Sequence, residues 1–141
     1  MKRLVIVERG KGKRNFSCFS TESIGKYGLA GYGTTAREAI EDLHMALSEC
    51  RELAKENRES FPDTVTFEYK FDIGAFFDYY PLDATAVAKY IGINASVLRQ
   101  YITAIREPRQ KQLDKIREGI EKISKDLGAG LMIDKPVTSY V

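Results

Sequence analysis

The sequence has few of the residues that metal sites and disulfide frameworks require. Its 141 residues include one histidine and two cysteines, and no Cys-x-x-Cys pair occurs. A structural zinc site therefore lacks ligands, and a disulfide framework lacks members. Cys18 and Cys50 lie in apolar-patterned segments, which favours buried or half-buried free thiols. We expect no metal and no cofactor.

Long hydrophobic runs are also missing. The longest apolar run near the start, residues 4–7, is much shorter than a signal-peptide core or a membrane span. We therefore expect the protein to remain in the cytoplasm. Hydrophobic residues still make up 43% of the chain, which is ordinary for a folded protein of one domain or two small ones.

The first half of the chain has the pattern of a sheet and one long helix. Strict alternation marks residues 65–71 as the clearest strand, and further strands are expected at 3–8, 15–20 and 28–33. A glycine-rich basic turn at 9–13 joins the first two. A phosphate-binding loop is disfavoured there, because no Gly-Lys-Ser or Gly-Lys-Thr follows. The fold class predicted is α+β, with an antiparallel sheet covered on one face by one helix.

The long helix has a clear sequence signal for its start. Thr35 followed by Glu38 is a capping box, in which each side chain satisfies a backbone N–H at the helix start. From Ala36 to Ala54 apolar residues keep helical spacing, and charged residues take the opposite face.

The second half of the chain has the apolar spacing of helices. Ile73, Phe76, Phe77 and Tyr80 have the spacing of a short helix that Pro81 ends. Its aromatic residues have the helical spacing of a core, although a base-stacking surface is an alternative.

Residues 83–105 have the pattern of a helix-turn-helix, although a plain helical hairpin is an alternative. Two apolar stripes with i, i+3, i+4, i+7 spacing are separated by Gly92, where a left-handed turn has no Cβ penalty. Asp83 and Asn94 are placed to cap the two helices, and capping is favoured over base reading for Asn94. The stripes contain Ala84, Val87, Ala88 and Ile91 in the first helix, and Leu98, Tyr101, Ile102 and Ile105 in the second.

The outward face of the second helix has the residues of a DNA reader. Residues 95–117 contain six basic residues and two acidic ones, whereas residues 1–72 contain twelve of each. The positive excess is therefore local, where phosphate contacts are needed. The predicted base-edge or phosphate contacts are Ser96, Arg99, Gln100 and Thr103, and the predicted phosphate contacts in the following turn are Arg106, Arg109 and Lys111.

A final helix is expected after Pro108, which suits the first turn of a helix. Its apolar seam from Leu113 to Leu127 either packs on the helix-turn-helix or forms a dimer contact. Gly119 within this seam suggests close approach of another backbone. The glycine-flanked tail that follows docks on a neighbour or covers its own core, and the pattern does not distinguish the two.

The strand-to-helix junction resembles that of the HicB antitoxins. Residues 28–39 follow the pattern Gly-x-x-x-x-Gly-x-Thr-x-x-Glu-Ala, and an amphipathic helix comes next. The basic proline turn and apolar helix after Ile105 resemble the Cro and phage-repressor class. The resemblance implies a trimmed ribonuclease-H-like domain at 1–72, a helix-turn-helix DNA-binding domain at 73–128 and a C-terminal tail at 129–141.

The resemblance also implies a function. HicB proteins are antitoxins of type II toxin–antitoxin pairs, which block a small HicA-type ribonuclease toxin and repress their own promoter. We expect the same here, with double-stranded DNA, a toxin and at least a second copy of the chain as partners. A palindromic operator is expected because one helix-turn-helix reads only a short half-site.

Two other functions remain open from the residues. One is a stand-alone transcriptional regulator whose first domain senses a ligand or dimerises. The other is a ribonuclease or other enzyme, which is disfavoured because no catalytic constellation is marked. A metal-dependent nuclease needs several converging carboxylates, and only Glu8 and scattered helical acids are available. His44 has no marked catalytic partner and reads as a boundary residue. We therefore expect a protein that is not an enzyme and has no catalytic residues.

Overall fold

The computed structural model describes residues 1–10 and 15–134, and within them it has an α+β fold with four strands and five helices. The predicted turn between the first two strands lies mainly at 11–14, outside the described residues. The elements are β1 (Lys2–Arg9), β2 (Phe16–Ser20), β3 (Ala30–Gly33), α1 (Ala36–Glu56), β4 (Thr66–Phe71), α2 (Ile73–Tyr79), α3 (Ala84–Ile91), α4 (Ala95–Ile102) and α5 (Gln110–Ala129). None of these helices is both long and apolar enough to cross a membrane.

The sheet is mixed, and the expectation of a purely antiparallel sheet was wrong for one pair of strands. The strand order is β3-β2-β1-β4, with β1–β2 and β2–β3 antiparallel but β1–β4 parallel. Val5 lies opposite Tyr69, and Val7 opposite Phe71. The helix explains this direction: α1 carries the chain back after β3, so β4 runs the same way as β1.

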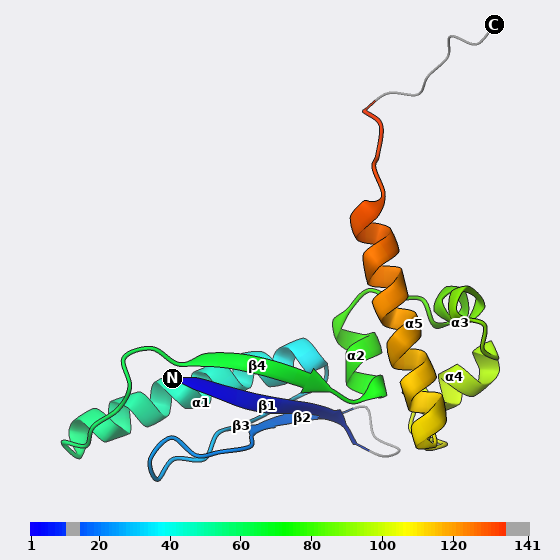
Figure 1. The fold of residues 1–141 in the computed structure, drawn as a ribbon. Coiled ribbons are helices and arrows are strands. Elements are labelled where there is room, and N and C mark those ends of the chain that lie inside the picture. Colours follow the sequence, from blue (N-terminus) through cyan, green and yellow to red (C-terminus); the bar gives the residue numbers. More distant parts are fainter. Residues whose placement is uncertain (11–14, 135–141) are drawn as a thin grey trace, which may run out of the picture.

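One face of the sheet is covered by α1 (Figure 1). Val5, Val7 and Cys18 on the strands and Leu43 on the helix are almost completely buried there. Burial raises the pKa of the Cys18 thiol to about 11, so this cysteine is protonated at neutral pH. On the opposite face, Phe19 and Tyr32 are 40% and 68% exposed.

The start of α1 differs in detail from the predicted capping box. Thr35 accepts from the Glu38 amide at 3.0 Å, as expected. The Glu38 carboxylate instead accepts from the backbone and hydroxyl of Thr34, at 2.9 and 2.6 Å, and these hydrogen bonds lower its pKa. Asp78 of α2 accepts from the Ala36 amide at 2.8 Å, so α2 also caps α1.

The four C-terminal helices gather at one end of the sheet (Figure 1). Val87, Ala88, Leu98, Tyr101 and Ile116 form a second buried core there, distinct from the core beneath the sheet. Helix α2 connects the two, because its Ala75 belongs to the first core while Ile73 and Phe77 pack against the second.

Aromatic rings surround this connection. Phe76 lies 4.9 Å from Tyr80 and 6.1 Å from Phe71, measured between ring centroids, and Phe71 lies 5.2 Å from Tyr79. Most of these rings are half-buried, and Tyr80 is 41% exposed. Their role here is packing between the two cores, as the helical spacing predicted.

Two helix boundaries and one contact near the C-terminus differ from the predictions. Helix α4 ends at Ile102, and Ile105 is 78% exposed because Ala104, with φ 59°, turns the chain away. Pro108 precedes the N-cap of α5, Arg109, rather than lying in the first turn. Gly119 faces the side chain of Ile91, not another backbone: a Cβ there would lie 2.3 Å from Ile91 Cγ2.

Gly31 provides a direct test of the contact between sheet and helix. A Cβ at this position would lie 2.1 Å from the Ala39 carbonyl oxygen and 2.5 Å from the Leu43 amide nitrogen, both in the backbone of α1. We expect Gly31→Ala to lower the free energy of unfolding by about 3 kcal/mol, measured by urea denaturation. Gly28→Ala is the control, since no atom lies within 4 Å of its Cβ. Equal unfolding midpoints for the two variants would contradict the packing described.

Candidate nucleic-acid interface

Helices α3 and α4 form a tight pair whose ends are capped as predicted. Asp83 accepts from the Ala86 amide at 2.9 Å, and Asn94 accepts from the Val97 amide at 3.0 Å. Gly92 between them has φ 79°, the left-handed conformation that suits glycine. The Asn94 side chain therefore caps α4, the role favoured from the sequence.

The inner face of α4 is fixed by packing. Leu98 is fully buried and Tyr101 is 8% exposed, and both pack in the second core with Val87 and Ala88 of α3. Lys115 of α5 donates to the Gly92 carbonyl at 3.3 Å, which adds a contact between α5 and the turn. The inner face of α4 is thus packed against the core, and its opposite face, with Ser96 and Arg99, is exposed to solvent.

The four predicted base-contacting residues lie on or just after α4. Ser96, Arg99 and Thr103 are exposed, and Gln100 is half-buried. The Thr103 hydroxyl donates to the Arg99 carbonyl at 2.9 Å, so its proton is engaged within the helix end. Arg99 donates to the Thr85 hydroxyl of α3 at 2.8 Å. Thr85 was missed from the sequence, where its place beside the second helix has no local signal.

The loop after α4 is folded back onto the helix. The Gln100 carbonyl accepts from the Ile105 and Arg106 amides at 3.0 and 3.3 Å, which holds Arg106 at the end of α4. The Arg106 side chain is exposed. Arg109 and Lys111 are exposed at the start of α5. The predicted phosphate-contacting residues are therefore all exposed, in the loop after α4 and at the start of α5.

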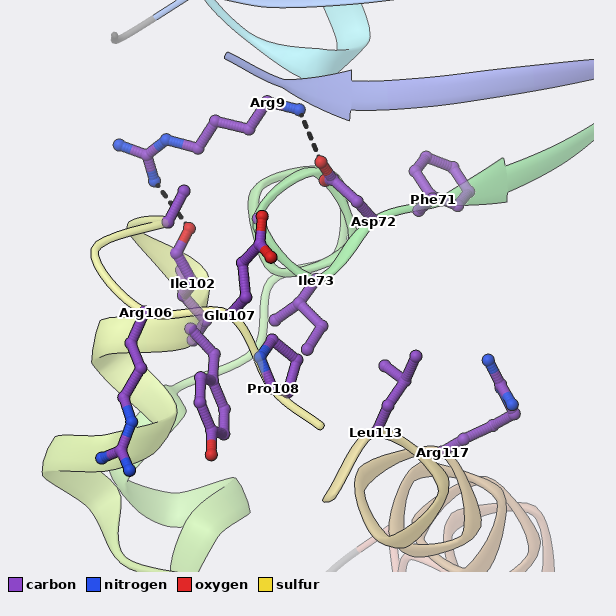
Figure 2. A pocket seen from close by; sticks show the side chains of 13 residues that line it. Arg9, Phe71, Asp72, Ile73, Ile102, Arg106, Glu107, Pro108, Leu113 and Arg117 are labelled. Atoms are coloured by element: carbon purple, nitrogen blue, oxygen red, sulfur yellow. Dashed lines mark hydrogen bonds between the residues drawn. The ribbon is translucent and has the colours of Figure 1, made fainter. Parts of the chain in front are cut away.

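Arg9 of β1 contacts the C-terminal end of α4 (Figure 2). The last carbonyls of a helix have no partner within it and need donors from elsewhere. Arg9 Nη1 donates to the Ile102 carbonyl at 3.2 Å, across 93 residues of sequence. The Arg9 backbone amide donates to Asp72, which also accepts from the Ala75 amide and so caps α2. One residue of the sheet thus contacts both α4 and the cap of α2.

A hollow of about 380 Å³ lies beside this junction. Figure 2 shows Arg9, Asp72 and Ile73 on one side of it and Leu113 and Arg117 of α5 on the other. Its remaining wall includes Tyr101, Arg106 and Pro108. The size falls in the range of small-molecule sites, which is about 300–1,000 Å³.

His44 lies away from this region, on α1. It is exposed, and its Nε2 atom lies 3.1 Å from the hydroxyl of Tyr69 on β4. Its ring meets Phe67 edge-on, with 5.3 Å between ring centroids. Partial burial raises the pKa of Tyr69. The contacts join α1 to the edge strand of the sheet.

Comparison with known proteins returned no significant similarity: no family model matches the chain, and no curated protein or solved structure does.

The Arg9 contact predicts that the sheet stabilises α4. We expect Arg9→Met, which keeps the apolar stem, to lower the free energy of unfolding by about 1–2 kcal/mol and to speed amide exchange in the last turn of α4. Arg3→Met is the matched control, because Arg3 also donates from β1 to a carbonyl, that of Ser23. Unchanged exchange in α4 of Arg9→Met, measured by mass spectrometry, would show that the junction does not hold this helix.

Proposed function

We propose that the chain is a HicB-type antitoxin acting in the cytoplasm. In this proposal α3 and α4 are a helix-turn-helix within a DNA-binding domain at 73–128, which represses the chain's own promoter. The domain at 1–72 binds and blocks a small, basic, mRNA-cleaving toxin of the HicA type. The observation that carries the DNA-binding part is the exposed polar face of α4, anchored by packing on its inner side and by hydrogen bonds at both ends.

The dimensions and side chains of α4 suit the major groove. An α-helix with its side chains is about 10–12 Å in diameter, and the major groove of B-DNA is about 12 Å wide. Arg99 suits guanine and Gln100 suits adenine, because each can make two hydrogen bonds to that base. The Arg99 side chain must then leave or share its bond with Thr85.

The basic residues after α4 suit the phosphate backbone. Arg106, Arg109 and Lys111 are exposed on the connection to α5 and the first turn of that helix. In a complex with α4 in the groove, this connection lies nearer the groove's rim than its floor. Contacts of this kind position the protein and add salt-dependent affinity without sequence preference.

Two observations support the toxin-binding part. The order of three strands, a helix and a fourth strand agrees with the domain that the resemblance implies. A toxin that binds RNA is basic, and the solvent side of α1 is rich in acidic residues. The exposed acidic residues of α1 are Glu38, Glu41, Glu49, Glu52 and Glu56.

The second candidate is a stand-alone regulator with a ligand-sensing first domain. The hollow between β1, α2, α4 and α5 favours it, because a ligand there would contact the junction that holds α4. A ligand that binds one arrangement of this junction more tightly than another would shift DNA affinity.

Base reading by α4 is tested with DNA from immediately upstream of the chain's own gene. We expect Arg99→Ala with Gln100→Ala to weaken binding by about 1–3 kcal/mol for each lost contact and to relax the sequence preference, measured by fluorescence anisotropy on matched and mutated duplexes. Arg106→Ala should weaken binding to every duplex and flatten its dependence on salt.

Lys125→Ala is the charge-matched control, since Lys125 is exposed on α5 well beyond the residues proposed to contact DNA. If the double variant keeps wild-type affinity and preference, α4 is not the reading helix. If Arg106→Ala changes preference at a single base pair, its role as a phosphate contact is wrong.

The toxin is tested by isolating the tagged chain from its native host. We expect a small basic protein to copurify in a defined ratio and to cleave RNA once separated from the chain under denaturing conditions and refolded. Repeated preparations that bind DNA but contain no such partner would favour the stand-alone regulator.

A further inference from the structure

The C-terminal end of α5 exposes more apolar surface than the rest of the helix. Ile116 is 4% exposed, and Ile120 and Ile123 pack against the second core, but Leu127 is 71% exposed. Beyond the helix, Leu131, Met132 and Ile133 are 96%, 98% and 69% exposed. The apolar seam of α5 thus continues past the core into a segment whose side chains are largely exposed to solvent. Contiguous exposed apolar surface of this kind marks an interaction site.

A groove lies beside the point from which this segment leaves. It runs between α5 and the start of α3, and its apolar lining includes Pro81, Leu82, Ala86, Tyr90, Ile123 and Leu127. The Tyr90 hydroxyl donates to Asp126, and Lys122 forms an ion pair with the same carboxylate at 3.4 Å. The Tyr90–Asp126 hydrogen bond joins α3 to α5, and the ion pair within α5 fixes the Asp126 carboxylate, so the groove is formed before anything binds.

The direction of the chain keeps the segment out of its own groove. Helix α5 remains helical through Gly128 and Ala129, and Gly130 has extended angles, φ −73° and ψ 136°. A left-handed residue at this point would reverse the chain. An extended one instead carries 131–134 onward beyond the end of α5, away from α3 (Figure 1).

We propose that residues 131–133 of one copy dock in this groove of a second copy, and that the exchange is reciprocal. An apolar tripeptide and an apolar groove are complementary, and both are present in every chain. Because both lie at the same end of α5, one two-fold axis near that end brings each tail to the other copy's groove. Such a self-complementary contact closes as a dimer. The inference concerns chain–chain contact alone and stands whether or not the chain binds DNA or a toxin.

The dimer is tested in the absence of DNA by sedimentation equilibrium of the full chain. We expect a dimer whose dissociation constant rises at least tenfold in Leu131→Asp with Met132→Asp, and likewise in Ala86→Glu on the groove side. All three positions are exposed, so folding should be retained, which circular dichroism checks. Met45→Asp is the control, because Met45 is an apolar residue 62% exposed on α1, outside the proposed contact.

Cross-linking tests whether the tail docks in its own groove or in that of a partner. In a Cys50→Ser background, chains with Ala86→Cys are mixed with chains carrying Met132→Cys and oxidised under mild conditions. We expect a covalent heterodimer. A wild-type monomer, a dimer insensitive to the tail and groove variants, or an internal cross-link in a single chain carrying both cysteines would each overturn the proposal.

Discussion

The contacts of Arg9 and Asp72 are the constraint on which the arrangement of the molecule depends. Arg9 lies at the end of β1, and it meets the cap of α2 with its backbone and the last carbonyl of α4 with its side chain. Both bonds lie where helix ends need partners from outside the helix. The orientation of α4 relative to the sheet is therefore set by hydrogen bonds as well as by the packing of α2 between two cores.

This constraint links the two parts of the proposed function. A surface that reads DNA must present its side chains in a fixed geometry, and α4 obtains that geometry from α3 and α5 on its inner side and from β1 at its end. The same strand lies at the centre of the sheet, between β2 and β4. In the proposal, a toxin bound to the domain at 1–72 would therefore contact a domain whose central strand, β1, is hydrogen-bonded to the end of α4.

Local signals in the sequence predicted most helices and strands. They failed where contacts between distant parts of the chain set the direction or the end of an element. The caps at Asp83 and Asn94, the left-handed Gly92 and the apolar stripes were sufficient to place α3 and α4. The parallel direction of β4 was missed, although the helix before it requires that direction. The end of α4 was predicted three residues too late, because the apolar Ile105 continues the helical spacing while Ala104 turns the chain.

The residues of the proposed interface also divide into those that local patterns predict and those that depend on tertiary contacts. Its exposed residues could be predicted, because polar and basic side chains opposite an apolar stripe are visible in one sequence. Thr85, which contacts Arg99, and Arg9, which contacts Ile102, could not. In the sequence, Thr85 lies 14 residues from Arg99 and Arg9 lies 93 residues from Ile102. No periodic pattern links the members of either pair.

Selection of duplexes from a random pool by the full chain tests whether α4 and the basic residues after it read DNA. We expect enrichment of an inverted repeat whose half-sites are about 34 Å apart, one turn of the double helix. Retention of duplexes without any enriched sequence, or no retention at low salt, would contradict that role of α4.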